Sequence, residues 1–423
     1  MSDLTQGYKR VKYSCYFCYV SGASAFALPP LLFSVFHETY GISYTLLGTL
    51  VLVNFLTQLS IDLIFSFFAK YFNTRLTVRL MPILSAVGLA VYALSPFLFS
   101  GNVYTGLLIG TVIFSLAGGL SEVLLSPTIA ALPSKTPDRD MSLLHSLYAV
   151  GVLLVVLIST AFFMLFDKTN WMYLTLFFAA LPIVTFILFA TSPLPDLDLS
   201  HEEPKTKEKT TAKKTHFGLM LCVFCIFLGG AAECAMTNWV SVYMESALGL
   251  TKAASDIAGL ALFAVFLGLG RILYARYGKN IQNTLLLGMA SAAVCYLVAV
   301  FSPLPAISAV ACILTGLCTA MLWPGTLIMM EEKFPHPGVA AYALMAAGGD
   351  LGGSVAPQLV GAVVDIVETN AFGESLAARL SMTAEQVGMK VGMLVGAIFP
   401  LVGIFLLLRI KRYFKRETVS EQE

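Results

Sequence analysis

The stretch Gly119-Leu120-Ser121-Glu122-Val123-Leu124-Leu125-Ser126-Pro127 is matched, much later in the chain, by Gly316-Leu317-Cys318-Thr319-Ala320-Met321-Leu322-Trp323-Pro324. A glycine, two leucines and a proline occupy the same positions in both copies, and both copies lie inside long apolar runs. The match predicts that the chain consists of two copies of one membrane-embedded half. Only the first copy carries an acid, Glu122. A duplicated membrane bundle with a charge in one half is typical of a solute carrier.

The composition indicates a membrane protein. Hydrophobic residues make up 57% of the chain and charged residues 12%, and the mean hydropathy is +0.81, whereas roughly a quarter of a soluble domain is charged. A helix needs about 20 apolar residues to cross a bilayer. We therefore predict an all-α membrane protein with twelve transmembrane helices, at residues 11–36, 44–69, 76–98, 104–131, 140–166, 171–191, 217–246, 252–277, 282–301, 305–332, 337–366 and 388–410.

The distribution of basic residues predicts the orientation of these spans. If the N-terminus is cytoplasmic, nearly all of the 26 Lys and Arg residues fall on the cytoplasmic side, the exceptions being Lys168, Lys252, Arg379 and Lys390. Cytoplasmic loops of membrane proteins are enriched in these two residue types. We therefore expect a multi-pass protein of the cell membrane (inner or plasma membrane) with both termini in the cytoplasm.

Several classes of function find no support in the sequence. The net charge of +1 and the lack of a basic patch interleaved with aromatic residues argue against nucleic acid as a partner. No phosphate-binding loop, His-Glu-x-x-His motif, Gly-x-Ser-x-Gly motif or acidic metal cluster occurs, so we expect no enzyme activity, no metal and no cofactor. The eight cysteines lie within predicted spans, where we interpret them as small packing residues.

One long polar segment divides the chain. Residues 192–216 are rich in Pro, Lys, Glu and Thr, a composition that predicts a flexible cytoplasmic linker. On either side we expect an N-terminal six-helix half, residues 1–191, and a C-terminal six-helix half with a cytoplasmic tail, residues 217–423.

Glu122 is the strongest candidate for a functional charge. An ionised side chain inside the bilayer costs about 2.5–3.5 kcal/mol on insertion scales, so each one requires a reason. Gly118, Gly119 and Ser126 lie one turn before and after Glu122 and leave room for water or a ligand. Since its span contains no basic residue, this carboxyl can exchange a proton near physiological pH, and we predict that it couples transport to protons. The alternative is a structural glutamate that hydrogen-bonds a neighbouring helix.

Spans 7 and 10 carry the candidate residues of the second half. Glu233 begins a polar stripe along span 7, and Asn238 and Trp239 follow it. An indole ring beside hydrogen-bonding amides suits a sugar, whose C–H face packs on the ring. Trp323, at the proline-bent site of span 10, is expected to contribute a second ring. We assign Glu233 to proton coupling and the other three to solute binding; the alternative for Trp239 is an anchor at the outer interface.

Spans 2 and 5 add further polar residues. Asn54, Gln58 and Asp62 recur every four residues and line one face of a helix. We assign the first two to solute binding and Asp62 to a gate or a structural role. His145, in the first turns of span 5, is expected to bind solute or to relay a proton with Glu122. The alternative is a neutral, hydrogen-bonded histidine.

Three candidates remain. Gln358, just after Pro357, is assigned to solute binding. Arg271 lies close enough to the cytoplasmic end of span 8 to extend to the interface, and we assign it to a gate or to packing. Asp350 lies among glycines that allow close helix packing and receives the same assignment.

The sequence Gly270-Arg271-Ile272-Leu273-Tyr274-Ala275-Arg276-Tyr277-Gly278-Lys279 resembles the Gly…Arg-x-Gly-Arg/Lys signature that the major facilitator superfamily carries at its 8–9 turn. The resemblance implies the fold of that superfamily, with two six-helix halves, and a gate or structural role for Arg276 and Gly278. The 2–3 turn departs from the signature, with Ala69 and Phe72 in place of the usual Asp and Gly.

Within the superfamily, the region of Glu122 and Pro127 in span 4 and of Leu144-His145 in span 5 is similar to the fucose–galactose–glucose proton symporter family. That resemblance implies proton-coupled uptake of a sugar. The chain departs from the family in span 1, where no acid lies between Lys12 and Glu38.

These observations predict a secondary active transporter that takes up a small polar organic solute, such as a sugar, together with protons, by alternating access of its two halves. We expect a monomer whose partners are the solute, protons and the lipid bilayer. Two alternatives stay open: a proton-driven exporter of drugs or metabolites, and a membrane sensor that detects a solute without transporting it.

Overall fold

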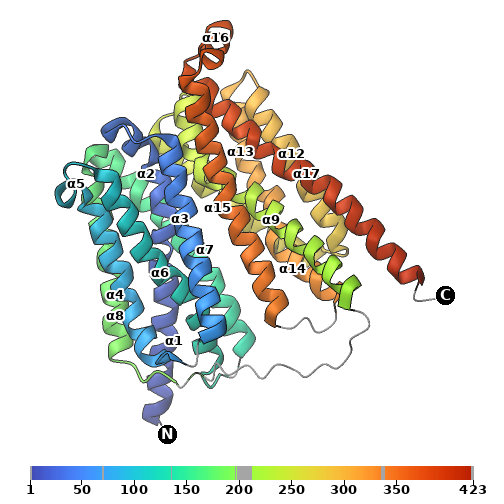
Figure 1. The fold of residues 1–423 in the computed structure, drawn as a ribbon. Helices are drawn as coiled ribbons and strands as arrows, with labels where there is room; N and C mark the ends of the chain where they lie inside the picture. Colours follow the sequence, from blue (N-terminus) through green and yellow to red (C-terminus); the bar gives the residue numbers. More distant parts are fainter. Residues whose placement is uncertain are drawn as a thin grey trace. The chain divides into compact units, whose positions relative to one another are not determined.

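The computed structural model describes residues 2–68, 71–134, 136–195, 197, 212–334 and 339–420. All elements within these ranges are helical (Figure 1). In the described part of the chain, twelve helices are long and apolar enough to cross a membrane. This confirms the predicted fold class and the predicted number of spans.

The helices alternate with short connections. Residues 2–190 form α1 (Ser2–Gly22), α2 (Ser24–Tyr40), α3 (Tyr44–Phe68), α4 (Thr74–Ala93), α5 (Ser95–Leu98), α6 (Val103–Ala130), α7 (Pro137–Leu165), the 3₁₀ helix η2 (Lys168–Asn170) and α8 (Trp171–Ala190). Residues 212–420 form α9 (Ala212–Val242), the π-helix η3 (Tyr243–Ala247), α10 (Lys252–Asp256), the π-helix η4 (Ile257–Ala261), α11 (Leu262–Tyr277), α12 (Ile281–Phe301), α13 (Pro305–Thr319), α14 (Leu322–Lys333), α15 (Val339–Thr369), α16 (Ala371–Leu380) and α17 (Ala384–Ser420). The short helices α5 and α16 lie between spans.

The structure differs from the predicted spans in four details. The first span is interrupted at Ala23, between α1 and α2, and the tenth at Ala320 and Met321, between α13 and α14. The short helix α16 lies between the predicted spans 337–366 and 388–410. The last helix continues to Ser420 instead of ending at residue 410, because its basic residues are good helix formers.

The two halves repeat each other in local structure as well as in sequence. At the start of α4, the side chain of Asn73 accepts a hydrogen bond from Leu76 N. At the start of α12, the side chain of Asn280 accepts one from Asn283 N. Both distances are 3.0 Å. An asparagine in this position satisfies one of the free N–H groups of the first helical turn, so the third span of each half begins in the same way.

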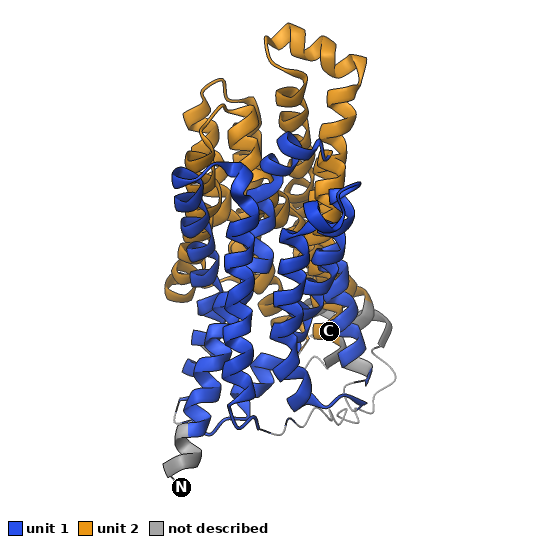
Figure 2. Ribbon diagram, turned by 90° about the vertical axis from the view of Figure 1, so that its left-hand side faces the viewer, with its two compact units in different colours: residues 1–42, 53–201 blue, residues 43–52, 202–423 orange. Residues whose placement is uncertain are grey.

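The chain divides into two compact units, coloured separately in Figure 2. Unit 1 comprises residues 1–42 and 53–201, and unit 2 comprises residues 43–52 and 202–423. The start of α3 is thus grouped with the later helices. The expected limits of the halves at 191 and 217 stay a prediction, since residues 196 and 198–211 of the intervening segment lie outside the described residues.

Hydrogen bonds explain why the start of α3 belongs to unit 2. The backbone N–H groups of Tyr44 and Thr45 donate to the two carboxylate oxygens of Asp365 on α15, over 2.9 and 2.7 Å. The first turn of a helix leaves such N–H groups unsatisfied, and a negative charge there is favourable. The Tyr44 hydroxyl donates to Glu385 of α17 over 2.6 Å. Residues from two later helices therefore hold this helix start.

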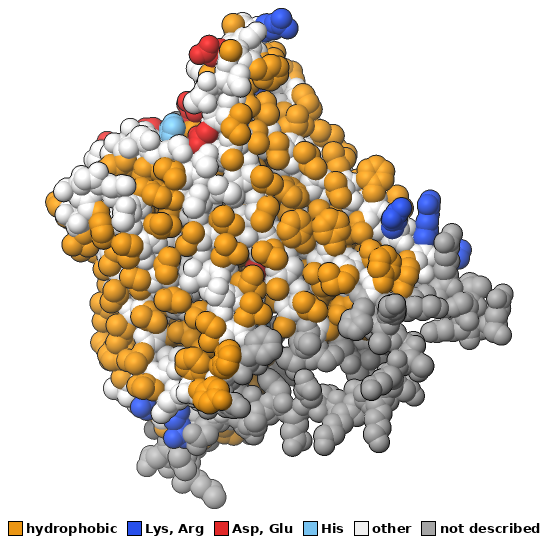
Figure 3. All heavy atoms as spheres, in the orientation of Figure 1, with side chains coloured by type: hydrophobic (Ala, Val, Ile, Leu, Met, Phe, Trp, Pro, Cys, Tyr) orange, Lys and Arg blue, Asp and Glu red, His pale blue; other side chains and the backbone are white. Residues whose placement is uncertain are grey.

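Each unit has an apolar interior built from small and large side chains. In unit 1 the interior includes Cys15 and Cys18 of α1, packed with leucines of α6. In unit 2, Cys222 and Cys225 of α9 are buried, as expected for packing residues. On the face shown in Figure 3, hydrophobic side chains cover most of the described surface, and Lys and Arg side chains lie toward the helix ends. Such a surface suits lipid contact.

Candidate functional site

The structure brings Glu122 and His145 together in unit 1. Both side chains are exposed, Glu122 on α6 and His145 on α7. Ser126, one turn after Glu122, has its Oγ 3.4 Å from Nε2 of His145. Tyr19 of α1 packs edge-on against the imidazole, with 5.6 Å between the ring centroids. Tyr19 also lies within electrostatic reach of Glu122. These four residues form one accessible polar site, the Glu122 site.

Sequence reasoning missed Tyr19. It lies three residues after Tyr16, whose side chain is part of the apolar interior of unit 1, and the two tyrosines look alike in the sequence. The sequence of span 1 could have indicated it, because the span lacks an acid but contains several tyrosines, which are its largest polar side chains. The structure shows that α1 contributes a phenol, instead of a carboxylate, beside Glu122.

Asp62 of α3 places a second carboxylate near the Glu122 site. It lies within electrostatic reach of Glu122, and its Oδ1 is buried without a hydrogen-bond partner among the described residues. The two helices approach closely, since a Cβ built on Gly119 would lie 2.9 Å from Cβ of Ile61. Asp62 therefore lies near Glu122, the candidate for proton coupling. Its position in the sequence, which suggested a gate or a structural role, did not predict this proximity.

Asn54 and Gln58, assigned to solute binding, are engaged with protein groups in unit 1. Gln58 Nε2 donates to Oδ1 of Asn54 over 2.8 Å, and Ser115 Oγ of α6 donates to the same oxygen over 2.7 Å. Both side chains are buried. In this conformation the pair therefore links α3 to α6, and solute contact at these positions stays a prediction.

In unit 2, Trp323 lies in a niche made by two glycines. A Cβ built on Gly349 of α15 would lie 2.5 Å from Cη2 of the indole, and one on Gly230 of α9 would lie 3.1 Å from Cζ3. The ring is half-buried. It follows the break between α13 and α14, so the bent site expected from Pro324 is present and positions the ring against two other helices.

Charged residues surround this part of unit 2. Glu233 lies one turn after Gly230 on α9, and its Oε2 is buried without a hydrogen-bond partner among the described residues. Arg271 of α11 is within electrostatic reach of Glu233, and Asp350 of α15 lies near the neighbouring Cys234. Three residues assigned separately from the sequence therefore lie in one region, close to Trp323.

The remaining solute-binding candidates of unit 2 make contacts inside the protein. Asn238 Nδ2 donates to Cys234 O in its own helix over 2.9 Å. Trp239 is fully buried, and its Nε1 donates to Pro357 O over 2.9 Å. Gln358 packs on the start of α3, where a Cβ built on Gly48 would lie 3.0 Å from its Cα. The contacts of Trp239 and Gln358 hold α9, α15 and the start of α3 together. Solute contact at all three residues stays a prediction.

The residues of the signature turn lie at the end of α11. Arg276 is exposed, with its guanidinium carbon 5.4 Å from the Tyr277 ring centroid. Gly278 follows the last helical residue and has a φ of −63°. Any residue adopts this φ, so backbone conformation does not require a glycine there. A Cβ at this position would instead lie 2.5 Å from atoms of Tyr274. The gate role of both residues stays a prediction.

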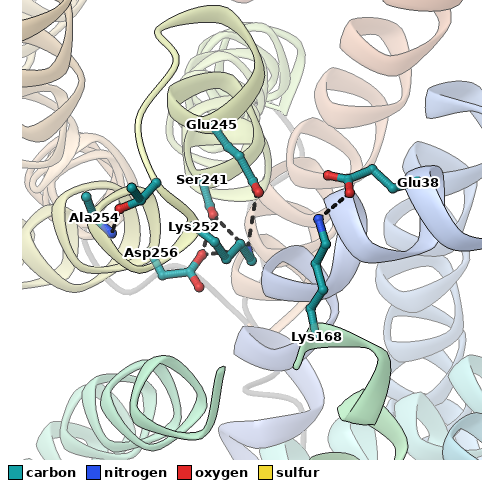
Figure 4. A network of polar contacts seen from close by, with 8 residues as sticks. Glu38, Lys168, Ser241, Glu245, Lys252, Ala254 and Asp256 are labelled. Atoms are coloured by element: carbon teal, nitrogen blue, oxygen red, sulfur yellow. Dashed lines mark hydrogen bonds and ion pairs between the residues drawn. The ribbon is translucent and has the colours of Figure 1, made fainter. Parts of the chain in front are cut away.

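A buried ionic cluster in unit 2 was not anticipated from the sequence (Figure 4). Lys252 Nζ donates to Oδ1 of Asp256 over 2.7 Å and to Oγ of Ser241 over 3.3 Å. Ser241 donates to the same Asp256 oxygen, and Glu245 Oε2 is 3.9 Å from Nζ. Asp256 has no exposed surface. The cluster joins the end of α9 to α10, beside two π-helical turns.

No group of three or more His, Cys, Asp or Glu side chains within the described ranges has a geometry that would hold a metal ion. The side chains gathered at the two sites carry carboxylates, an imidazole, a guanidinium, a serine hydroxyl and aromatic rings. These groups exchange protons and bind polar organic molecules by hydrogen bonds and ring stacking.

The family of the chain follows from a comparison with known families. Residues 14–357 match the model of the Major Facilitator Superfamily. The chain belongs to this superfamily. It is therefore a multi-pass membrane transporter, and the resemblance seen at the 8–9 turn is confirmed at this level. A comparison with curated proteins gave no match.

Solved structures of several transporters share this fold. A bacterial homologue of the human lysosomal transporter Spinster, in an inward-facing and occupied conformation, superposes with a TM-score of 0.75 at 14% identity, covering 96% of this chain and 97% of that one. A D-xylose–proton symporter gives 0.68 at 16% identity, covering 93% and 96%. The nucleoside transporter NupG gives 0.66 at 14% identity, covering 96% and 99%. At these identities the likeness concerns the fold alone.

Proposed function

We propose that this transporter takes up a small polar organic solute, such as a sugar, together with protons. The observation that carries the proposal is the Glu122 site. An accessible carboxylate in a transmembrane helix lies within electrostatic reach of the Tyr19 phenol and one turn before Ser126, and both of these residues contact the His145 imidazole. Such a charge is costly inside a membrane unless it has a function, and its hydroxyl-rich surroundings suit a hydrophilic solute.

Unit 2 supplies a second set of suitable groups. Trp323 offers a half-buried ring for the apolar face of a solute, and Glu233 offers a second carboxylate for proton exchange. The proposal therefore assigns proton coupling to Glu122 and Glu233, and solute contact to His145 and Trp323. The fucose–galactose–glucose symporter family remains our proposed subfamily. The chain lacks the acid that this family carries in span 1. The phenol of Tyr19 and the carboxylate of Asp62 are the polar groups that take its place near Glu122 in this proposal.

Proton movement in sealed vesicles tests this function. The purified transporter is reconstituted in liposomes that enclose a pH-sensitive dye, and a panel of hexoses, pentoses and nucleosides is added outside. We expect at least one solute to cause inward proton flux. Outward proton flux on addition of solute to the outside, as expected when solute and protons exchange in opposite directions, would favour the exporter. Solute binding without any flux would favour the sensor.

Replacement of His145 or Trp323 is expected to weaken solute binding. His145→Ala removes a hydrogen-bonding group, and Trp323→Phe removes part of a ring and its N–H. Losing one net hydrogen bond costs about 0.5–1.5 kcal/mol, which corresponds to roughly a twofold to twelvefold increase in Kd. Isothermal titration of the purified variants with the solute found by the flux assay measures this.

The matched control is Trp171→Phe. Trp171 is fully buried, and its Nε1 donates to Tyr40 Oη over 3.2 Å, away from both proposed sites. This variant is expected to keep the Kd of the parent. Parental affinity in both His145→Ala and Trp323→Phe would remove these residues from the solute site.

A further inference from the structure

The break between α13 and α14 exposes one backbone carbonyl that the helix itself does not satisfy. Pro324 has no N–H group to donate to Ala320 O, four residues earlier. Arg271 of α11 supplies the missing donor, since its Nε lies 3.2 Å from Ala320 O. An orphaned carbonyl inside a membrane protein is costly, so this contact stabilises the break.

The packing around the break shows that Arg271 is held against it. Gly270 precedes Arg271, and a Cβ built there would lie 2.5 Å from Cβ of Ala320. A side chain on residue 270 would therefore push α11 away from the break. The glycine allows the backbone of α11 to lie close enough for the guanidinium to reach Ala320 O.

The guanidinium of Arg271 also lies within electrostatic reach of Glu233. Ala320 O accepts from Nε alone, and a guanidinium carries further N–H donors on its two terminal nitrogens, in the same plane. The buried Oε2 of Glu233 has no hydrogen-bond partner in the described part of the chain. A charged Glu233 attracts the guanidinium and keeps it in place, whereas a protonated Glu233 does not.

Other charged groups around Glu233 are few among the described residues. Asp350 on α15 and the thiol of Cys234 lie nearby. The acids of α14, Glu331 and Glu332, lie at the C-terminal end of that helix, and Lys390 of α17 is bonded to Val300 O. Arg271 is thus the cation through which the charge of Glu233 reaches the break.

We propose that Arg271 is a positioning residue, which holds the break between α13 and α14 through Ala320 and transmits the charge of Glu233 to the Trp323 ring. Trp323 lies three residues after Ala320 and packs on Gly349 and Gly230, so a shift of the break moves the ring. The inference rests on the proposed function, because it links the proton site of unit 2 to its solute-binding ring.

Fluorescence of Trp323 tests the proposal without any solute. In full-length protein with Trp171→Phe and Trp239→Phe, Trp323 is the remaining tryptophan. Its emission maximum is recorded from roughly pH 4 to pH 9, because carboxylates in proteins titrate at roughly pH 4 and, at buried positions, up to several pH units higher. If the double variant does not fold, the spectrum of Trp323 is obtained by subtracting that of Trp323→Phe from that of the parent.

The expected results separate the charge of Arg271 from its hydrogen bond. The parent should show a pH-dependent shift, and Arg271→Lys should keep it, because lysine has both the charge and a donor. Arg271→Gln should lose the shift, since the amide donates to Ala320 O but carries no charge. Glu233→Gln should lose it too.

Two further variants complete the series. Pro324→Ala should also lose the shift, because the alanine backbone has an N–H group that bonds Ala320 O within the helix and makes the guanidinium contact unnecessary. Glu374→Gln, an exposed acid of α16, is the matched control and should keep the shift.

Three results would overturn the proposal: no shift in the parent, a full shift in Arg271→Gln, or a shift that is lost in Asp350→Asn but kept in Glu233→Gln. These outcomes are independent of the transport assay. Proton-coupled uptake without the fluorescence response would reject the role of Arg271 alone. The fluorescence response without any solute-driven proton flux would reject the proposed function alone.

Discussion

Glu122→Gln is expected to abolish the accumulation of solute against its gradient, while exchange of solute across the membrane persists. Glutamine keeps the size and hydrogen-bonding capacity of the side chain but does not take up a proton in the physiological range. Without a proton to carry, transport is no longer driven by the proton gradient, but the Ser126, His145 and Tyr19 groups around it stay in place. Uptake into energised liposomes measures accumulation, and counterflow of labelled solute measures exchange.

The matched control is Glu38→Gln. Glu38 is an exposed acid of unit 1 that pairs with Lys168 (Figure 4), and its replacement should leave both assays unchanged. The loss in Glu122→Gln should appear at every pH at which the parent accumulates solute. If the variant still accumulates solute as the parent does, Glu122 has no part in proton coupling.

Asp256→Ala is expected to cause the largest loss of stability of any single change considered. It removes the carboxylate that accepts from Lys252 and Ser241 and leaves the lysine largely buried, with only 13% of its side chain exposed. Breaking a buried pair by removing one partner costs about 3–5 kcal/mol. Thermal unfolding of the purified protein in detergent should show a clear decrease in Tm.

The exposed ion pair between Glu38 and Lys168 provides the control for this experiment. Its side chains are 47% and 36% exposed, and such pairs contribute only about 0–1 kcal/mol. Glu38→Ala should therefore leave Tm almost unchanged. Removing both charges of the buried pair, as in Lys252→Met with Asp256→Leu, should restore part of the stability. Equal Tm values for Asp256→Ala and Glu38→Ala would show that the buried cluster does not stabilise unit 2.

Some candidate site residues could be picked out from the sequence because their signal is local. Glu122, Glu233, Asp350 and Arg271 are charges inside apolar runs, and any such charge stands out in the sequence. Pro324 likewise indicates the break in span 10, since a proline removes a helical hydrogen bond wherever it occurs. What these residues contact was not predictable. Arg271 binds the carbonyl freed by Pro324, and Tyr19 lies beside His145, although neither pairing leaves a pattern in the sequence.

The sequence by itself determined the twelve spans and the repeat, because crossing a bilayer requires about 20 apolar residues in a row and that is a property of each segment alone. Only the tertiary structure decided which polar groups meet. Tyr44 and Asp365 are 321 residues apart, yet the Asp365 carboxylate caps α3, the helix that begins at Tyr44. Such contacts depend on how α3, α15 and α17 pack. Inside a membrane, helix packing is set by the fit of small residues and by hydrogen bonds between helices, because the lipid around a helix is as apolar as its neighbouring helices.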